Sequence, residues 1–309
     1  MELHRLERLV NYCWPSQKKL KAMLESELLQ QRGQERIRSR DGFLYSPGSH
    51  PVLLIAHLDT VHKQRPTMFF IDKSRTPDGD LWCAEGIGGD DRYGVFIIME
   101  LLRELDCHVL FTEDEEIGGR GAVKFCESGL HPDVQFMVEF DRQGKDNAVF
   151  YGCDNPDFTA FVEQYGFKQN EGTFSDISII APALGIAAVN LSSGYYCAHS
   201  RQEYIRVADV KSIIDRASRL ISNVKTRYGY VNGDHPDWRW DSDGWRYDGR
   251  NDEAVCPACN VLLGDSMFLD YCPCCFSPLI VPCDWCGDAV RISDCTVIKG
   301  EVYCRFCAE

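Results

Sequence analysis

Histidine and acidic residues follow several predicted strands of this chain at the point where each strand ends. The apolar run 51–57 leads into His57 and Asp59, and the run 108–113 leads into Glu115 and Glu116. The chain places such residues at five strand or loop ends: His57 and Asp59, Asp90 and Asp91, Glu115 and Glu116, Glu139 and Asp141, and His199. One acid in such a place is usually a helix cap or a solvated loop residue, but five in this order indicate a site.

These residue types match the ligands of a catalytic metal site. Zn²⁺ accepts imidazole nitrogen and carboxylate oxygen, and catalytic zinc sites leave a position for water. Two ions a few ångströms apart need a carboxylate that bridges them. An adjacent Glu that binds no metal can take the proton of the attacking water, while the metals stabilise the developing oxyanion. The pattern therefore predicts metal-assisted hydrolysis.

Five segments together resemble the successive motifs of the zinc-dependent di-metal exopeptidase superfamily. They are HLDTV (57–61), GGDDRYG (88–94), FTEDEEIGG (111–119), EFDR (139–142) and AHSRQEY (198–204). The superfamily includes peptidase T, acetylornithine deacetylase-like enzymes and the single-domain aminopeptidases. The resemblance covers residues 50–225, and its specificity comes from the motifs taken together in this order. It implies hydrolysis of a peptide or related amide bond.

The resemblance also implies two catalytic zinc ions, or another divalent metal, and a role for each matching residue. The implied ligands are His57, Asp90, Glu116, Asp141 and His199. Asp90 would bridge the two ions, with His57 and Asp141 completing the first site and Glu116 and His199 the second. Glu115 is the implied general base, and Asp59 is the carboxylate that would orient the imidazole of His57. Glu139 stays an alternative to Asp141, because it lies two residues earlier on the same strand face.

One departure from the superfamily concerns the lid that many members insert between the EFD-type and GTxSD-type motifs. Here GTFSD, which ends at Asp176, follows Asp141 too closely for such an insertion. Asp176 resembles a substrate-pocket residue of the superfamily, with helix capping as the alternative. Without a lid to supply an oxyanion-binding group, Tyr195 or Tyr196 is the candidate for a substrate-binding hydroxyl, with packing as the alternative.

The segments that must position these residues alternate between two patterns. Strand-like segments are 35–40, 42–46, 51–57, 108–113, 134–141 and 185–191. Helical patterns cover 18–31, 92–105, 118–129, 157–166 and 207–224. This alternation predicts an α/β fold with a mostly parallel central sheet and helices on both faces. In such sheets the site lies beyond the carboxyl ends of the strands. We expect Asp91 to cap the helix that follows it, and His62 to be a loop residue.

Ten of the sixteen cysteines fall in residues 254–309. Eight of them form Cys-x2-Cys pairs: Cys256 and Cys259, Cys272 and Cys275, Cys283 and Cys286, Cys304 and Cys307. Four thiolates saturate one zinc ion, so these pairs predict two structural zinc ions in a double zinc ribbon. Consecutive pairing is the simplest arrangement, while a cross-braced one and Cys274 in place of Cys275 stay open. The paired spacing and the absence of a signal-peptide pattern favour metal over disulfides.

These patterns divide the chain into three parts. We expect a catalytic domain at 1–227, an acidic, aromatic linker at 228–253 and the zinc ribbon at 254–309. The net charge of −14 argues against nucleic acid and anionic membranes as partners. The expected protein is cytoplasmic, with a peptide or acylated-amine substrate and, through its zinc ribbon, a protein partner or a second copy of itself.

Three functions are compatible with these observations. The leading one is aminopeptidase-like hydrolysis, and the second is N-deacylation or carboxypeptidase action by the same site. The third is a zinc-ribbon scaffold or binding protein with a vestigial hydrolase site. Glu115 argues against the third, because a degenerate site has no reason to keep its base together with all its ligands.

Overall fold

The structure is a computed structural model that describes residues 3–172 and 174–233, together with strands at 280–282, 289–291, 295–298 and 301–304. The chain divides into two compact units, Met1–His235 and Pro236–Glu309. All the site residues discussed above lie in the first unit, apart from the paired cysteines.

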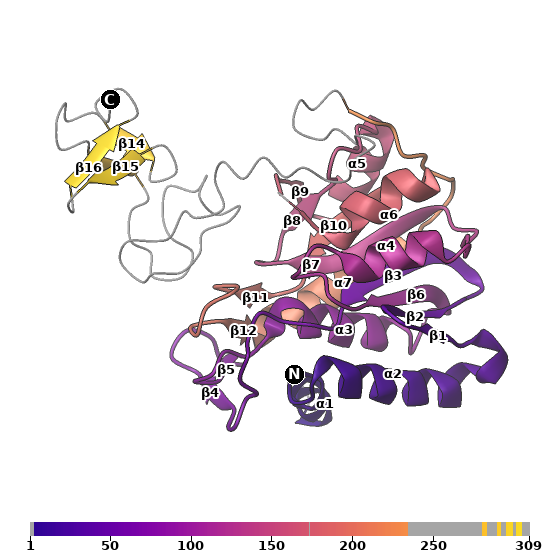
Figure 1. Ribbon diagram of the computed structural model, residues 1–309, viewed down its shortest axis with the longest axis horizontal. Helices are drawn as coiled ribbons and strands as arrows, with labels where there is room; N and C mark the ends of the chain where they lie inside the picture. Colours follow the sequence, from indigo (N-terminus) through magenta and orange to yellow (C-terminus); the bar gives the residue numbers. More distant parts are fainter. Residues whose placement is uncertain are drawn as a thin grey trace. The chain divides into compact units, whose positions relative to one another are not determined.

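An eight-stranded sheet with the order β1-β2-β6-β3-β7-β10-β8-β9 forms the centre of the first unit (Figure 1). Its strands are β1 (Arg38–Arg40), β2 (Phe43–Ser46), β3 (His50–His57), β6 (Cys107–Thr112), β7 (Phe136–Arg142), β8 (Asn147–Val149), β9 (Lys168–Gln169) and β10 (Ala188–Ser192). The neighbours β6, β3, β7 and β10 run parallel, whereas the β1–β2, β2–β6 and β8–β10 pairs are antiparallel. This confirms the predicted α/β class with a mostly parallel sheet.

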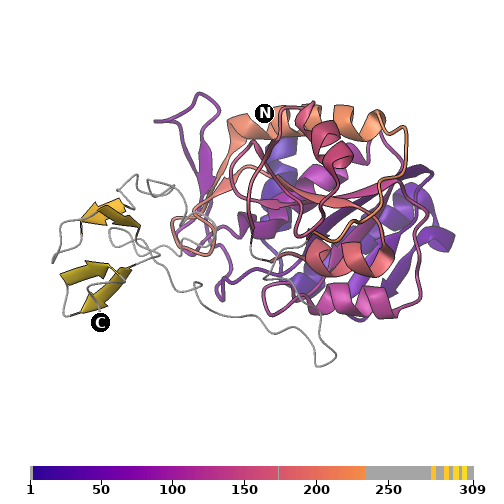
Figure 2. The ribbon, with the colours of Figure 1, turned by 90° about the horizontal axis from the view of Figure 1, so that it is seen from above.

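Helices cover both faces of this sheet (Figures 1 and 2). They are α1 (Leu3–Cys13), α2 (Gln17–Arg32), α3 (Gly89–Leu101), α4 (Arg120–Glu127), α5 (Pro156–Glu163), α6 (Asp176–Leu184) and α7 (Val207–Ser222), with a 3-10 turn at Gln34–Arg36. Every residue of α3 is buried, because α3 lies between the sheet and helices α1 and α7. Among the described residues, no helix combines the length and the apolar character needed to cross a lipid bilayer.

The sequence patterns do not indicate α1, whose position depends on a tertiary contact. Arg5 Nε lies 2.7 Å from Glu100 Oε2, and Arg8 Nη1 lies 2.6 Å from Glu100 Oε1. The Glu100 side chain is on α3 and is only 1% exposed. Two guanidinium groups therefore neutralise a carboxylate that would be costly to bury alone, and this attaches α1 to α3.

A smaller antiparallel sheet lies beside the large one, with the order β11-β12-β5-β4. Its strands are β4 (Phe70–Asp72), β5 (Asp80–Trp82), β11 (Tyr195–Tyr196) and β12 (Tyr204–Arg206). Strands β11 and β12 flank the loop that carries His199. The sequence patterns do not predict these short strands.

The segment between β7 and α6 is where a lid would be inserted. Its described residues form β8, α5 and β9, and both strands belong to the large sheet. In the part of this segment that the structure describes, no separate domain is present.

The first unit extends past residue 227, the end expected from the sequence. Tyr228 exchanges backbone hydrogen bonds with the sheet: its N–H donates to Gln135 O at 2.8 Å, and its carbonyl accepts from Ala187 N at 2.9 Å. Its ring centroid lies 5.1 Å from that of Phe158 and 5.5 Å from that of Phe161. The start of the expected linker is thus part of the core of this unit, because its aromatic side chain covers apolar surface.

In the second unit the structure describes two antiparallel strand pairs, β13 (Ile280–Pro282) with β14 (Ala289–Arg291), and β15 (Cys295–Ile298) with β16 (Glu301–Cys304). Seven of the predicted zinc ligands lie outside the described residues: Cys256, Cys259, Cys272, Cys275, Cys283, Cys286 and Cys307. Cys304 is described by its backbone alone, as the register partner of Cys295. The double zinc ribbon stays a prediction.

The position of Tyr228 gives a test of this domain boundary. Tyr228→Ala in the full chain should lower the free energy of unfolding by about 2 kcal/mol, because a half-buried aromatic ring leaves an apolar cluster. The measurement is urea unfolding, with Val231→Ala as the control, since Val231 is 49% exposed and should shift stability by at most about 0.5 kcal/mol. If the two variants have equal free energies of unfolding, Tyr228 does not contribute to the core, and the first domain ends at residue 227.

Candidate metal centre

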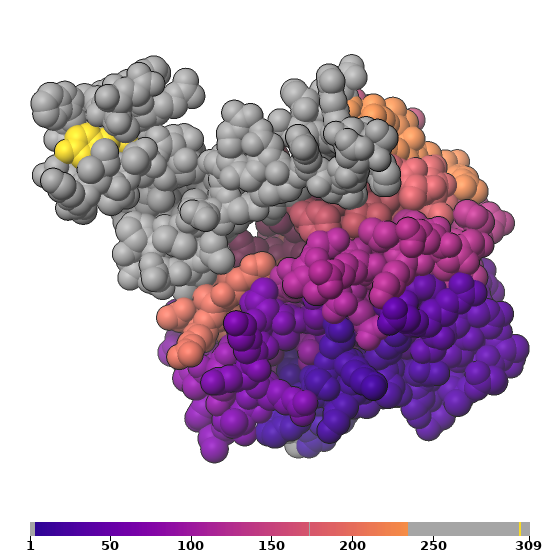
Figure 3. All heavy atoms as spheres, in the orientation of Figure 1, coloured from indigo at the N-terminus to yellow at the C-terminus, as the bar shows by residue number. Residues whose placement is uncertain are grey.

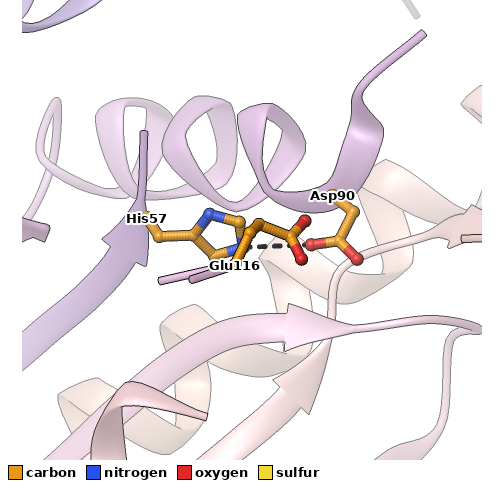
Figure 4. A group of neighbouring side chains, drawn as sticks. All are labelled: His57, Asp90 and Glu116. Atoms are coloured by element: carbon orange, nitrogen blue, oxygen red, sulfur yellow. Dashed lines mark hydrogen bonds and ion pairs between the residues drawn. The ribbon is translucent and has the colours of Figure 1, made fainter. Parts of the chain in front are cut away.

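The carboxyl ends of the parallel strands bring most of the predicted ligands to one edge of the sheet. His57 is the last residue of β3, Asp141 lies near the end of β7, and Glu116 follows β6. Asp90 stands at the start of α3 and His199 in the loop between β11 and β12. Figure 4 shows the imidazole of His57 and the carboxylates of Asp90 and Glu116 directed toward one another.

Asp90 lies between the two imidazoles. Its Oδ1 is 3.0 Å from His57 Nε2, and its Oδ2 is 3.1 Å from His199 Nε2. His199 has a φ of 62°, in the left-handed region that residues other than glycine rarely adopt. Such a backbone is typical of functional sites, and here it belongs to the residue whose ring reaches Asp90. Each oxygen of one carboxylate therefore faces a different histidine, and the bridging role of Asp90 stays a prediction.

A second carboxylate faces each imidazole. Asp141 Oδ1 lies 3.5 Å from His57 Nε2, and Glu116 Oε2 lies 3.2 Å from His199 Nε2. The two halves of the cluster are thus His57 with Asp141 and His199 with Glu116, joined by Asp90. Both nitrogens and all these oxygens are donors that Zn²⁺ accepts, so the residues present fit a pair of divalent ions.

The Asp59 carboxylate contacts three groups of this cluster: the His57 imidazole and the backbone N–H groups of Glu115 and Glu116. Its Oδ1 lies 3.3 Å from His57 Nδ1, on the side of the ring that faces away from Asp90. The same carboxylate accepts backbone hydrogen bonds from Glu115 N at 3.0 Å and Glu116 N at 3.1 Å. It therefore contacts the imidazole and also holds the loop that carries both glutamates, while its predicted role in orienting a metal ligand stays a prediction.

Glu115 lies close to the cluster without pairing tightly to either imidazole. Its Oε2 is 4.0 Å from His57 Nε2, farther than the oxygens of Asp90 and Asp141. Burial raises the pKa of Glu115 well above its ordinary value, and the neighbouring charge of Asp141 acts in the same direction. A buried carboxyl with a raised pKa is suited to accept and return a proton.

The charges of the cluster are strongly coupled. Burial raises the pKa of Asp141 to about 7, with the charge of Asp90 adding to the effect. Although burial opposes it, hydrogen bonds to Asp90 and Glu116 raise the pKa of His199 to about 12. The same kind of contacts raise the pKa of His57 well above its ordinary value. More carboxylates than imidazoles are buried here, and cations balance such a cluster.

Glu139, the alternative ligand, is directed elsewhere. Its Oε2 accepts a hydrogen bond from Ser175 Oγ. Asp141 is held toward His57 by Asn190, whose Oδ1 accepts from Asp141 N at 2.8 Å and whose Nδ2 donates to Asp141 O at 3.2 Å. The structure thus brings Asp141 to the cluster and leaves Glu139 behind it.

The three residues predicted to bind substrate, Tyr195, Tyr196 and Asp176, have different hydrogen-bond partners. Tyr195 is buried, and its hydroxyl donates to Asp141 Oδ1 at 3.3 Å. Tyr196 points to the other face of the same strand, where its hydroxyl donates to Asp209 Oδ2 at 2.6 Å. Asp176 is the first residue of α6 rather than its N-cap, which is Ser175. Its Oδ2 accepts from Thr112 Oγ1, and burial raises its pKa to about 6.

Asp91 has the capping role expected for it. Its Oδ1 accepts from Gly94 N at 3.0 Å, and its Oδ2 accepts from His57 N at 3.3 Å. It lies near His57 and Asp141 in the cluster, but both of its oxygens already hold backbone N–H groups.

Sequence reasoning assigned no role to Glu203, although it lies in the AHSRQEY segment. Glu203 is fully buried, and its Oε1 accepts from Asp90 N at 2.9 Å. Its Oε2 accepts from Gly88 N at 3.0 Å and lies 2.6 Å from His62 Nε2. His62, expected to be a loop residue without a role, is therefore the partner of a carboxylate that fixes the backbone of Asp90. The only sequence feature that could have indicated a role for Glu203 is its short distance along the chain from His199.

No protein-family model and no curated protein matches this chain. Its fold is similar to solved structures of three proteins. They are the aminopeptidase PepT from Bacillus cereus (13% identity, TM-score 0.54, 70% of this chain and 97% of that one), a tripeptidase from Staphylococcus aureus (12%, 0.54, 70% and 96%) and a glutaminyl cyclase from Tannerella forsythia (16%, 0.50, 72% and 97%). At these identities the likeness concerns the fold.

The hydrogen bonds of Glu203 predict an effect on metal binding. Glu203→Ala should weaken zinc binding by about 10- to 100-fold, because the carboxylate that fixes the backbone of Asp90, the predicted bridging ligand, is lost. Competition with a chromophoric chelator measures this. Glu85→Ala is the control, since Glu85 pairs with exposed Thr67 and should leave zinc affinity unchanged. Native affinity in Glu203→Ala would mean that Asp90 is positioned without it.

Proposed function

We propose that this protein catalyses the metal-dependent hydrolysis of a peptide or related amide bond, with Glu115 as general base. The observation that carries the proposal is the position of Asp90, whose two oxygens each face a different histidine. Each histidine in turn faces a carboxylate of its own, Asp141 or Glu116. The likeness of the fold to an aminopeptidase and a tripeptidase supports the choice of reaction, with aminopeptidase-like action as the leading form.

Two zinc ions would be held by the cluster, the first by His57 and Asp141 and the second by His199 and Glu116, with Asp90 shared. Bound there, zinc supplies Lewis acidity to the scissile carbonyl and to the attacking water. The residues around it arrange the reaction. Asp59 keeps the His57 imidazole in one orientation through its Nδ1, so that Nε2 faces the cluster.

Proton transfer is the task of Glu115. Its carboxylate lies beside the cluster. Its Oε2 is 4.0 Å from His57 Nε2, whereas the oxygens of Asp90 lie 3.0 Å from His57 Nε2 and 3.1 Å from His199 Nε2. It takes the proton from the attacking water and gives it to the nitrogen of the departing amine, as one group can in both halves of the reaction. Burial favours the protonated form of Glu115. This stabilises Glu115 after it has taken the proton from water and before it gives the proton to the amine.

Tyr195 is the hydroxyl donor nearest to this chemistry among the residues predicted for that role. Its hydroxyl is bonded to Asp141 Oδ1, so it lies beside the first histidine rather than at the surface. We propose that it turns toward the carbonyl oxygen as negative charge develops there. Asp176 is buried, with its Oδ2 accepting a hydrogen bond from Thr112 Oγ1, and its contact with substrate stays a prediction.

The cysteine-rich tail is proposed to bind two structural zinc ions and to contact a protein partner or a second copy of the chain. The Cys-x2-Cys spacing supports the metal ions, and the surplus of acidic over basic residues in this segment is unsuited to nucleic acid. The tail supplies none of the predicted ligands of the catalytic pair.

Metal content separates the two proposed kinds of site. The full chain should bind about four zinc ions, two through thiolates and two through the cluster. The combined change His57→Ala and His199→Ala should remove about two of them, and these should also be the first removed by a chelator, because catalytic ions exchange more readily. Elemental analysis after dialysis gives the counts. Four ions retained by the double variant would contradict the proposed catalytic site.

The role of Glu115 predicts a separation of binding from chemistry. Glu115→Gln should keep both cluster ions but lower kcat by about 10² or more, because the amide cannot accept the proton. Turnover of short peptides and metal content are measured on the same samples. Glu127→Gln, an exposed change on α4, is the control and should behave as the native protein does. Peptide turnover by Glu115→Gln at the native rate would exclude Glu115 as the base.

A further inference from the structure

The two histidines of the cluster are held in different ways. The His57 side chain is only 1% exposed, and Asp59 contacts its Nδ1. The His199 side chain is 38% exposed, and in the described part of the chain its ring has two partners, Asp90 and Glu116, both at Nε2. Neither burial nor a contact at Nδ1 therefore fixes this ring. Its position depends on the backbone of the loop that carries it.

The loop that carries His199 consists of residues 197–203, between β11 and β12. Two of its residues, Cys197 and His199, have φ values of 57° and 62°. Residues other than glycine rarely adopt this left-handed region, and they keep it only where the surrounding structure imposes it. Within the loop, Ser200 Oγ donates a hydrogen bond to Cys197 O at 2.8 Å. A short loop cannot impose such a backbone alone, so the two strands at its ends must hold it.

Two stacked tyrosines join the ends of this loop. Tyr196 is the last residue of β11 and Tyr204 is the first of β12, and the two are register partners. Their ring centroids are 5.1 Å apart, and the ring planes differ by 11°. Stacked aromatic pairs of this kind are attractive beyond the area that they bury. The Tyr196 hydroxyl also donates to Asp209 Oδ2 at 2.6 Å, which attaches one end of the loop to α7.

Arg206, at the end of β12, lies over both of these rings. Its guanidinium carbon is 4.8 Å from the ring centroid of Tyr196 and 5.4 Å from that of Tyr204. Its Nε donates to Asp80 Oδ1 at 3.1 Å, and its Nη2 donates to the Tyr204 hydroxyl at 3.0 Å. Asp80 is on β5 and is buried. A planar guanidinium can stack on rings and pair with a carboxylate at the same time, so Arg206 attaches both ends of the loop to β5.

The tyrosine pair belongs to a row of aromatic residues that crosses the small sheet β11-β12-β5-β4 (Figure 1). In register order the row is Phe70, Trp82, Tyr204 and Tyr196, and the ring centroids of Phe70 and Trp82 are 5.0 Å apart. On the other face of the sheet, Leu81 and Ile205 are buried. Figure 3 shows the salmon-coloured atoms of the β11–β12 region at the surface, next to the purple atoms of the β4–β5 region. The ends of the loop are therefore held by a packed sheet.

We propose that Arg206 is a positioning residue of the second metal site, the one formed by His199 and Glu116. It fixes the two ends of the loop 197–203, and the backbone of that loop places His199 against Asp90 and Glu116. In the described part of the chain, Arg206 itself makes no ion pair with a proposed metal ligand. The inference rests on the metal centre proposed above. It predicts that Arg206 affects the ion held by His199 and not the ion held by His57.

Zinc affinity of the full chain tests this proposal without turnover. A mild chelator removes the cluster ions, elemental analysis confirms their loss, and zinc is returned in competition with a chromophoric chelator. Arg206→Met keeps the apolar stem but loses the guanidinium. It should weaken the ion held by His199 and Glu116 by about 10- to 100-fold and leave the other cluster ion nearly unchanged. Arg206→Lys should have an intermediate effect, because lysine keeps the charge opposite Asp80 but cannot stack as a plane.

A second background shows whether Arg206 acts through His199. His199→Ala should retain only the ion held by His57 and Asp141, and adding Arg206→Met should leave the affinity of that ion unchanged. Arg216→Met is the matched control. The Arg216 guanidinium also lies over a ring, 4.4 Å from the centroid of Phe167, and also pairs with a carboxylate, Asp146, at 2.9 Å. Its partners lie outside the loop 197–203 and the small sheet, so both cluster ions should bind as in the native protein.

The outcomes separate this proposal from the metal centre on which it rests. If the native chain takes up two cluster ions and Arg206→Met binds both as tightly, the role of Arg206 is overturned and the metal centre stands. An equal loss of affinity for the ion that remains in His199→Ala would show a general loss of structure and would also overturn that role. If Arg206→Met does not fold, native affinity for both ions in Arg206→Lys overturns it. A native chain that takes up no cluster ions overturns the metal centre and this inference together.

Discussion

Asp90 is shared by two imidazoles, and most of the other contacts at this edge of the sheet serve to keep it there. A carboxylate that faces His57 on one side and His199 on the other needs both its backbone and its side chain held in place. Glu203 holds the backbone through Asp90 N and Gly88 N. The buried helix α3 begins beside Asp90 and fixes the direction of the backbone that follows Asp90.

The second requirement is charge. Several carboxylates are buried around two imidazoles, and burying an unpaired charge is costly. The cluster meets this requirement by pairing each histidine with acids from different strands, and by giving Asp59 and Asp91 backbone N–H groups as partners. This explains why the site lies where parallel strands end, since only there do the ends of β3, β6 and β7 come together. Imidazole nitrogens and carboxylate oxygens of this kind are donors that a divalent metal ion accepts.

The absence of an inserted lid in the described part of the chain leaves the other side of the site to the N-terminal helices. The junction of α1 and α2, the loop after β3 and the segments 86–92 and 114–117 together line a cavity. The ion pairs of Arg5 and Arg8 with Glu100 hold α1 on α3 and so hold this wall. A structural contact far from the cluster thereby fixes part of the lining of this cavity.

The sequence by itself determined the parts of this protein that depend on local spacing. The alternation of apolar runs predicted the parallel sheet, and the motifs at strand ends predicted that His57, Asp90, Glu116, Asp141 and His199 belong to one site before any contact was known. Only the tertiary structure decided between neighbours on one strand: Tyr195 but not Tyr196 reaches the cluster, and Asp141 faces His57 whereas Glu139 faces Ser175. The pairing of His62 with Glu203 and the gathering of Lys63, Arg65 and Arg92 around one cavity were also beyond the sequence. The physical reason is that these contacts join residues distant along the chain, and no periodicity or local propensity records which distant segments will pack together.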